Sequence, residues 1–239
     1  MRRSKIALAV AVGILAAAMP GHALAGGAAQ YLVSGRPYSL APLCRSHGVD
    51  GEVSLAIDHH TGRMVAAWMQ DIGPTASLTS SIVLTAASTD GGRTWTRTVP
   101  SGVMLCERPP GPDDGVFDPS VSVGPDGRWY LARGGAEATP APGGSSQIFV
   151  TTSKDGVHWG RPVLVPAGPT IDFDTLVADP KTAGRAYVTW SNYTTGLPVP
   201  DNQVMMSVTS NGGRTFSLPR IVHAAPLGHV DVIAHLVVL

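Results

Sequence analysis

A short motif rich in hydroxyl, acidic and glycine residues occurs three times in the chain and constrains its fold more than any other feature. The copies read STDGGRTW at residues 88–95, SKDGVHW at residues 153–159 and TSNGGRTF at residues 209–216. In a tight turn, the hydroxyl and the Asp or Asn side chain can hydrogen-bond turn N–H groups that no strand partner would satisfy. The glycines accept a positive φ at little cost, and the final aromatic residue can be buried as the returning strand begins. Each copy therefore predicts a turn between two strands.

The motif is the Asp-box, and through it the chain resembles the sialidase-like family of Asp-box (BNR-repeat) β-propellers. Each of the three copies follows an apolar stretch, as the resemblance requires. In the enzymes of that family the Asp-box lies away from the active site, so the motif indicates the fold and does not by itself imply catalysis. The Asp-box residues are Ser88, Asp90, Gly92, Trp95, Ser153, Asp155, Trp159, Asn211, Gly213 and Phe216.

The segments around each motif copy repeat as well. A predicted hairpin comes first, with strands at 53–58 and 63–68, 119–123 and 128–133, and 175–178 and 185–190. Third strands are predicted at 81–87, 147–152 and 203–208, and fourth strands at 96–99, 162–165 and 218–222. From the end of the hairpin to the central Asp or Asn there are 22 residues in the first two units and 21 in the third. Each unit therefore predicts a four-stranded antiparallel sheet, which is one propeller blade.

The predicted fold class is all-β, a β-propeller of four-stranded antiparallel blades with no helix in the mature chain. Blades are expected at about 50–100, 117–166 and 172–223, and residues 229–239 are interpreted as the first strand of a fourth. The resemblance implies six blades, which would need roughly 300 residues or more. An open stack would expose an apolar sheet face and unpaired edges, which soluble proteins avoid. We therefore expect an incomplete six-bladed propeller, and the alternative is closure by self-association with another chain.

The first 25 residues are predicted to be a secretory signal peptide. A positively charged start is followed by an apolar stretch at residues 6–19 and by Ala-Leu-Ala at residues 23–25, which is a typical cleavage site. The apolar stretch is short for a membrane span, so a retained anchor is the less favoured alternative. We expect a secreted, extracellular protein with no membrane span after cleavage, beginning with an irregular segment at residues 26–49.

Both cysteines, Cys44 and Cys106, lie after the predicted cleavage site. An even number of cysteines in an exported chain favours one disulfide between them, and two buried free thiols are the alternative.

The charge balance excludes one class of partner. The chain has 17 basic and 17 acidic residues, and it has no basic stripe that could neutralise phosphates, so no nucleic acid partner is expected. The sequence predicts no cofactor and no metal site. Calcium held by Asp113, Asp114 and Asp118 would be the closest approach to one, but no regular ligand spacing supports it.

Acidic residues gather where the chain is predicted to enter the innermost strand of each blade. These residues are Asp118, Asp172, Asp174 and Asp231. In a propeller the innermost strands approach the central axis, so carboxylates from several blades could meet there. Glycoside hydrolysis needs a positioned acid/base carboxyl and a second group at the anomeric centre, and we propose Asp118, Asp172 and Asp174 for these roles. The alternative is that each Asp only caps a turn.

The resemblance to sialidases implies further site residues. Those enzymes use three arginines for the substrate carboxylate, a Tyr/Glu nucleophile pair and an Asp acid/base. Arg63, Arg128 and Arg185 occupy one repeat position, so the repeat explains them. We therefore propose as substrate-binding residues those that the repeat leaves unexplained, together with one aspartate: Arg36, Arg108, Arg133 and Asp231. Arg133 stands where the other copies have Trp, and Tyr193, in a loop that varies between units, is the candidate nucleophile.

The sequence therefore favours a secreted sialidase-like glycoside hydrolase acting on glycoconjugates. The competing hypothesis is a non-catalytic Asp-box propeller that binds glycans or proteins at the cell surface. Both hypotheses make a glycan or glycoprotein the expected partner.

Overall fold

A computed structural model describes residues 33, 49–71, 81–100, 116–135, 147–167, 171–192, 203–226 and 236–238. The chain divides into two compact units, residues 1–30 and 31–239, and all described residues lie in the second. The predicted signal peptide, both cysteines and residues 229–235 of the fourth-blade strand predicted at 229–239 lie outside the described residues. Within the part of the chain that is described, no helix is long and apolar enough to cross a membrane.

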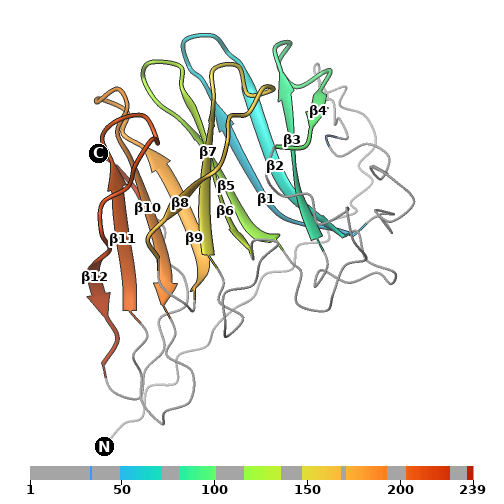
Figure 1. The fold of residues 1–239 in the computed structure, drawn as a ribbon. Helices are drawn as coiled ribbons and strands as arrows, with labels where there is room; N and C mark the ends of the chain where they lie inside the picture. Colours follow the sequence, from blue (N-terminus) through green and yellow to red (C-terminus); the bar gives the residue numbers. More distant parts are fainter. Residues whose placement is uncertain are drawn as a thin grey trace, which may run out of the picture. The chain divides into compact units, whose positions relative to one another are not determined.

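The described residues form three four-stranded antiparallel sheets, each from consecutive strands (Figure 1). Blade 1 contains β1 (Asp50–Ile57), β2 (Met64–Asp71), β3 (Ser81–Ser88) and β4 (Thr96–Thr98). Blade 2 contains β5 (Val116–Val123), β6 (Trp129–Gly135), β7 (Gln147–Ser153) and β8 (Val163–Val165). Blade 3 contains β9 (Ile171–Ala178), β10 (Ala186–Asn192), β11 (Gln203–Thr209) and β12 (Arg220–Ala224). The predicted blade is confirmed in all three repeats.

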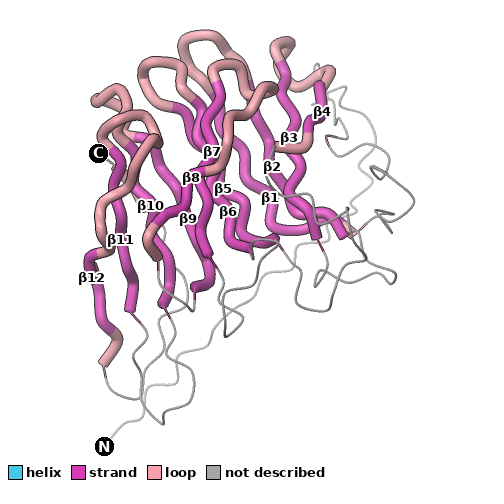
Figure 2. The backbone as a smooth tube through the Cα atoms, viewed as in Figure 1, coloured by secondary structure: helices cyan, strands magenta, loops and turns pink. Residues whose placement is uncertain are grey.

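The described turns lie at one end of the strands, as Figure 2 shows. They connect the first strand of each blade with the second, and the third with the fourth. The Gly-Pro-Asp-Gly turn of blade 2 is closed by a hydrogen bond from the Gly127 N–H to the Gly124 carbonyl at 3.0 Å, as a four-residue turn requires. The segments that connect the opposite ends of the strands lie largely outside the described residues.

The core lies between the blades because each face of the middle sheet packs on a neighbour. One cluster joins Val65 and Ala67 of blade 1 to Val121 and Leu131 of blade 2. A second cluster joins blade 2 to blade 3, with Trp190 at its centre. A strand buried on both faces is expected to have an almost continuous apolar sequence, and β2 and β3 have this pattern.

The first Asp-box satisfies its turn N–H groups with two side chains. The buried Ser88 hydroxyl accepts a hydrogen bond from the Gly92 N–H at 2.9 Å and donates to Asp90 Oδ1 at 2.8 Å. The same Asp90 oxygen accepts the N–H groups of Arg93 and Thr94 at 3.0 and 2.9 Å. The Trp95 indole donates to the Gly92 carbonyl at 2.8 Å. The turn therefore has the side-chain hydrogen bonds that the motif predicts.

The third copy shows why Asn can replace Asp. Asn211 Oδ1 accepts the N–H groups of Arg214 and Thr215, both at 3.1 Å, as Asp90 does in the first copy. Its amide nitrogen donates to the Thr215 hydroxyl at 2.8 Å, whereas in the first copy the equivalent hydroxyl donates to the carboxylate. The hydroxyl can serve as donor or acceptor, so the turn keeps its shape with either residue.

A glycine of each later Asp-box packs on the preceding blade. A Cβ on Gly156 would lie 2.3 Å from Val65 Cγ2, and a Cβ on Gly213 would lie 2.8 Å from Thr152 Cγ2. Val65 pairs with Ala87 across β2 and β3, and Tyr130 pairs with Thr152 across β6 and β7, so the two glycines meet equivalent surfaces. Glycine is required here because no other residue leaves room for the neighbouring blade.

Polar contacts also join the blades, and one of them repeats. The Ser54 hydroxyl accepts the Val121 N–H at 3.0 Å, and the equivalent Ser120 hydroxyl accepts the Leu176 N–H at 2.8 Å. Arg63, at the start of the second strand of blade 1, donates to the Asp155 carbonyl of the blade 2 Asp-box at 2.7 Å. Each blade is therefore joined to the next by a serine of its first strand, and blade 1 is also joined to blade 2 by Arg63.

Candidate active site

The innermost strands begin earlier than the sequence predicts, which corrects the position of the acidic residues. The predicted strands started at residues 119 and 175, whereas β5 starts at Val116 and β9 at Ile171. The reason is an irregularity in each strand, beyond which pairing resumes, for example between Val116 and Gly135. Asp118, Asp172 and Asp174 therefore lie inside strands and not in connecting loops.

All three inner strands carry this irregularity at the same place. The register shifts between Gly51 and Ser54 in β1, between Phe117 and Ser120 in β5, and between Asp172 and Thr175 in β9. In the first two strands the residue at the shift is acidic and left-handed, with φ of 51° at Glu52 and 49° at Asp118. Such bulges are frequent beside active sites, because they redirect a side chain that regular pairing would hold elsewhere.

The bulges bring acidic side chains of three blades together. The Asp118 N–H donates to Glu52 Oε2 at 2.6 Å, which links β1 to β5. The negative charges of Asp118, Glu52 and Asp172 act on Asp174 strongly enough to raise its pKa. The inner strand β5 contacts both β1 and β9. The acidic cluster therefore spans the three blades at one end of their inner strands.

Asp174 is the buried member of this cluster. Its side chain belongs to a residue that is only 4% exposed, and neither carboxyl oxygen has a hydrogen-bond partner among the described residues. Burial, first, and the neighbouring carboxylates, second, raise the pKa of Asp174 well above the usual 3.8. Both effects favour the neutral form of the carboxyl, because the charged form has lost its solvation and faces like charges.

Arg133 lies beside this carboxyl, in the second strand of blade 2. It is 1% exposed and stands opposite the bulge at Asp118, where blades 1 and 3 have the buried Trp68 and Trp190. Burial lowers the pKa of the Arg133 guanidinium to about 10, and the charge of Asp174 acts in the opposite direction. The replacement of Trp by Arg therefore puts a cation in the wall of the acidic cluster.

The structure brings together four of the eight proposed catalytic and substrate-binding residues: Asp118, Asp172, Asp174 and Arg133. The other four lie outside the described residues: Tyr193, Arg36, Arg108 and Asp231. Asp113 and Asp114, proposed with Asp118 as the closest approach to a calcium site, also lie outside them. In the described part of the chain, no group of three or more His, Cys, Asp or Glu residues is arranged to hold a metal ion.

Glu52 is a member of the cluster that sequence reasoning missed. The signal was present, because Glu52 lies five residues before Ile57 just as Asp118 lies five residues before Val123, and both strands end at these residues. Aligning the hairpins residue by residue would have placed the two acids at one repeat position.

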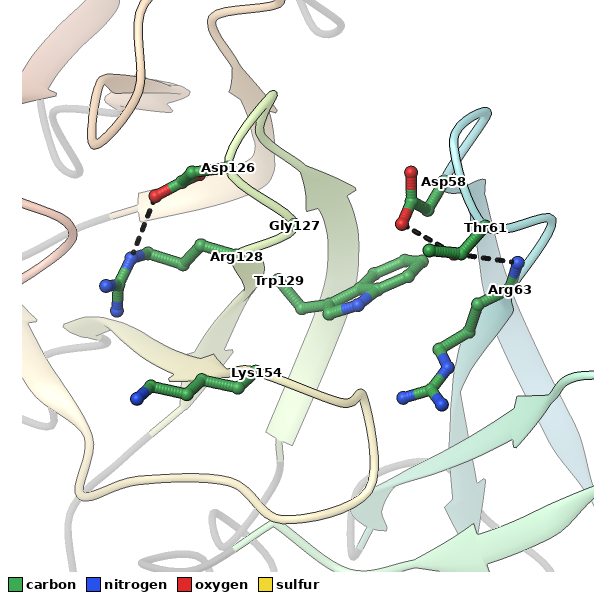
Figure 3. Close-up of a pocket in the computed structure, with 8 residues that line it drawn as sticks. All are labelled: Asp58, Thr61, Arg63, Asp126, Gly127, Arg128, Trp129 and Lys154. Carbon is green, nitrogen blue, oxygen red and sulfur yellow. Dashed lines mark hydrogen bonds and ion pairs between the residues drawn. The ribbon is translucent and has the colours of Figure 1, made fainter.

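Away from the acidic cluster, a hollow of about 370 Å³ lies near the turns that connect the strands of blades 1 and 2 (Figure 3). Its lining is polar and includes Asp58, Arg63, Arg128 and Lys154. Two of these groups have hydrogen-bond partners: Asp58 accepts the Thr61 hydroxyl at 2.6 Å, and Arg63 donates to a backbone carbonyl of the next blade. Arg128 Nε lies 3.6 Å from Asp126. We interpret this hollow as the seam between two blades, and the acidic cluster is the stronger candidate site.

Comparison with solved structures identifies the class of fold. A microbial sialidase, Hadza Hz136, matches with a TM-score of 0.58 at 14% identity, over 80% of this chain and 41% of the sialidase chain. An exo-β-1,3-galactanase from Clostridium thermocellum, 1,3Gal43A, matches at 16% identity over 76% of this chain and 37% of its own, with a TM-score of 0.47. An α-L-arabinanase from Penicillium chrysogenum matches at 18% identity over 64% and 42%, with a TM-score of 0.43.

The described residues form four-stranded blades of a β-propeller, a fold similar to that of sialidase Hz136, as the Asp-boxes predicted. It spans less than half the length of these three solved chains. No protein-family model and no curated protein sequence matches it.

Proposed function

We propose that the protein is an exported, carbohydrate-active propeller that hydrolyses glycosidic bonds at the acidic cluster of its inner strands. The observation that carries this proposal is the cluster of acidic side chains from the three inner strands around the buried Asp174, and burial and the neighbouring acids raise the pKa of that carboxyl well above the usual 3.8. Glycoside hydrolysis needs a carboxyl that still holds its proton near neutral pH, together with a second carboxylate nearby. Export is supported by the signal-type start of the sequence alone.

In this proposal Asp174 donates its proton to the glycosidic oxygen as the bond to the leaving group breaks. Asp118 and Asp172, which are less buried, provide the negative charge that stabilises the positive anomeric centre or activates the attacking group. Arg133 is 1% exposed, so we assign it a positioning role beneath the bulge and not a direct substrate contact.

A glycan is the proposed substrate class, and a sialoside is the first substrate to test. The likeness to sialidase Hz136 supports this choice, but at 14% identity it is a likeness of fold. Tyr193 is proposed as the nucleophile, Arg36 and Arg108 are proposed to bind the substrate carboxylate, and Asp231 is proposed as a further substrate-binding residue.

A non-catalytic role in binding glycans or proteins is the competing proposal. It is favoured by the burial of both Asp174 oxygens, because a general acid must reach its substrate. A buried carboxyl without hydrogen bonds can also have a purely structural role at the end of the inner strands where the bulges lie.

The variant Asp174→Asn separates the two proposals, with Asp179→Asn as its control. Asp179 is also a buried aspartate, but it lies in the hairpin turn of blade 3, where it accepts the N–H groups of Lys181 and Thr182. The measurements are turnover of a panel of fluorogenic glycosides, with sialosides first, and binding of the same glycans immobilised on a surface.

Loss of turnover in Asp174→Asn, with glycan binding and the activity of Asp179→Asn retained, supports the hydrolase. Glycan binding without turnover in the parent protein supports the binding role. A parent protein that neither turns over nor binds any glycan of the panel contradicts both.

A further inference from the structure

Side-chain acceptors join the inner strands of neighbouring blades at several points. The Ser54 hydroxyl of β1 accepts the Val121 N–H of β5 at 3.0 Å. On β5, the hydroxyls of Ser120 and Ser122 accept N–H groups of β9 at 2.8 and 3.0 Å. In each case a side chain of one inner strand binds a backbone N–H of the next, because the two strands belong to different sheets and their backbones do not pair.

Glu52 continues this series at the end of the strands that carries the acidic cluster. Its Oε2 atom accepts the Asp118 N–H at 2.6 Å, so a side chain of β1 again binds a backbone N–H of β5. Here, however, the acceptor is a carboxylate and not a hydroxyl. A hydrogen bond to an ionised acceptor is shorter and about twice as strong as one between neutral groups. The series therefore has its charged acceptor at the candidate site.

The two residues that this bond joins have an unusual backbone conformation. Glu52 and Asp118 have φ of 51° and 49°, and among the described residues no other residue apart from glycine has a positive φ. For a residue with a Cβ, the left-handed conformation costs about 1–2 kcal/mol. Such a conformation persists only where the surrounding contacts hold it, and it is typical of functional sites. The bond between the Asp118 N–H and Glu52 is a contact of this kind.

The strand beside β5 in its own sheet holds this point less firmly. The register of β5 against β6 shifts between Phe117 and Ser120, so the ladder does not fix Asp118 as it fixes residues in regular pairs. The next residue is Pro119, which has no N–H to donate. The bond to Glu52 instead holds the Asp118 backbone from the neighbouring blade.

We propose that Glu52 is the positioning residue of the acidic cluster. It fixes the left-handed bulge of β5 through the Asp118 N–H and so sets the direction in which the Asp118 carboxyl meets the substrate. The effect on turnover rests on the proposed function, whereas the effect on the bulge does not. Glu52 acts on the reaction through Asp118 and not by touching the reacting atoms.

Glu52 also acts through its charge. The buried Asp174 faces acidic groups from all three inner strands, and these are Glu52, Asp118 and Asp172. On β6, Arg133 interacts with Asp174 with the opposite sign. Removal of the Glu52 charge leaves fewer like charges around Asp174, so the pKa of Asp174 is expected to fall.

Two substitutions at Glu52 separate position from charge. Glu52→Gln keeps an oxygen that can accept the Asp118 N–H but removes the charge, whereas Glu52→Ala removes both. On the fluorogenic glycosides, Glu52→Ala is expected to lower kcat by about tenfold to a hundredfold with little change in KM, because a small misplacement of a reacting group costs that much. Glu52→Gln is expected to recover most of kcat. Its pH profile should lose activity at a lower pH on the alkaline side, because Asp174 gives up its proton earlier.

Ser54→Ala and Asp50→Asn are the matched controls. Ser54→Ala removes a link of the same kind between β1 and β5, but away from the acidic cluster. Asp50→Asn removes a charge from the same strand, where Asp50 accepts a hydrogen bond from the Gln70 side chain at 2.9 Å. Both variants are expected to keep the kcat and the pH profile of the parent protein.

A measurement without substrate tests the bond itself. Hydrogen exchange of the Asp118 amide, followed by nuclear magnetic resonance, reports whether its N–H is held by an acceptor. We expect protection of this amide in the parent protein, in Glu52→Gln and in both controls, and loss of protection in Glu52→Ala.

Loss of protection and of turnover in Glu52→Ala, with both recovered in Glu52→Gln, supports the positioning role. Equal exchange of the Asp118 amide in all variants overturns it, and so does a Glu52→Ala variant that is as active as the controls. A Glu52→Gln variant as inactive as Glu52→Ala also overturns it, because the charge and not the bond would then matter. A parent protein that turns over no glycan contradicts the proposed function, and the exchange of the Asp118 amide then decides whether Glu52 holds the bulge.

Discussion

At the scale of single residues, the hydroxyl of each Asp-box supports the turn from inside. Ser88, Ser153 and Thr209 are all buried, and each accepts the N–H of the glycine that follows in its box, at 2.9 to 3.0 Å. The shorter second copy keeps this bond although its glycine is one residue nearer. The hydroxyl is therefore fixed by a buried donor, whereas the central Asp or Asn serves donors nearer the surface.

Removal of one of these hydroxyls is expected to destabilise the protein measurably. Ser153→Ala leaves the buried Gly156 N–H without its acceptor, which costs about 1–3 kcal/mol of unfolding free energy. Ser210→Ala is the control, because Ser210 is exposed beside the third box and is expected to change stability by less than about 0.5 kcal/mol. Urea denaturation measures both, and equal effects would contradict the role assigned to the hydroxyl.

The buried carboxyl of Asp174 is expected to make stability depend on pH in a defined direction. Its folded-state pKa lies above the unfolded value near 3.8, so the folded protein binds this proton more tightly than the unfolded chain. The stabilisation from this proton is complete below pH 3.8 and is lost as the pH rises toward the folded-state pKa. Asn resembles the protonated carboxyl and does not titrate.

Asp174→Asn should therefore raise the melting temperature at pH 7 and leave it nearly unchanged at pH 3.5. Thermal melts of parent and variant at several pH values between these limits provide the measurement. A variant that is less stable than the parent at pH 7 would show that the carboxylate is charged and paired in the folded protein.

At the scale of elements, the Asp-box turn is a packing surface as well as a connection. The turn between β7 and β8 places Gly156 on β2 and β3 of blade 1, and the turn between β11 and β12 places Gly213 on blade 2 in the same way. A single glycine thus serves the turn through its positive φ and the neighbouring blade through its lack of a side chain.

Two alanine substitutions separate these roles. Gly127 has a φ of 70° and open space around its missing Cβ, so Gly127→Ala carries only the backbone strain of about 1–2 kcal/mol. Gly156 has a φ of 71°, but its Cβ would lie 2.3 Å from Val65 Cγ2, so Gly156→Ala is expected to cost about 1–3 kcal/mol more. If chemical denaturation shows equal losses, the glycine is required by the turn and not by the contact between blades.

Most strands of this protein could be predicted, and the reason is local. The third strands agree with the structure to within one residue, since each is an apolar run bounded by a loop and an Asp-box. The inner strands start three to four residues earlier than predicted, because a bulge interrupts the alternation at Glu52, Asp118 and Asp174. The same bulges position the acidic cluster, so the error in the strands and the missed Glu52 have one cause.

At the scale of the whole molecule, serine hydroxyls couple one blade to the next. Ser120 accepts the Leu176 N–H and donates to the Leu176 carbonyl at 3.3 Å, so one side chain replaces a pair of sheet hydrogen bonds between inner strands. Ser54 makes the equivalent bond to Val121. The inner strands are thus connected by side chains where their backbones do not pair.

Ser120→Ala should loosen blade 3 selectively. The Leu176 N–H would lose its acceptor in a buried position, and we expect faster amide exchange across β9 with little change in β1–β4. Hydrogen exchange followed by mass spectrometry resolves the two regions, and Ser210→Ala again serves as the control. A uniform increase over all three blades would indicate that the sheets open together and that this contact does not couple a particular pair.

The sequence alone determined the kind of unit from which the protein is built. The motif residues hydrogen-bond within their own turn, and the apolar strands lie directly beside it in the sequence. Interactions between residues close in the sequence are therefore enough to predict three four-stranded blades. Tertiary structure alone decided the rest. The pKa of Asp174 and the place of Arg133 opposite a bulge both depend on residues that lie far apart in the chain. They become visible only once the inner strands stand beside one another.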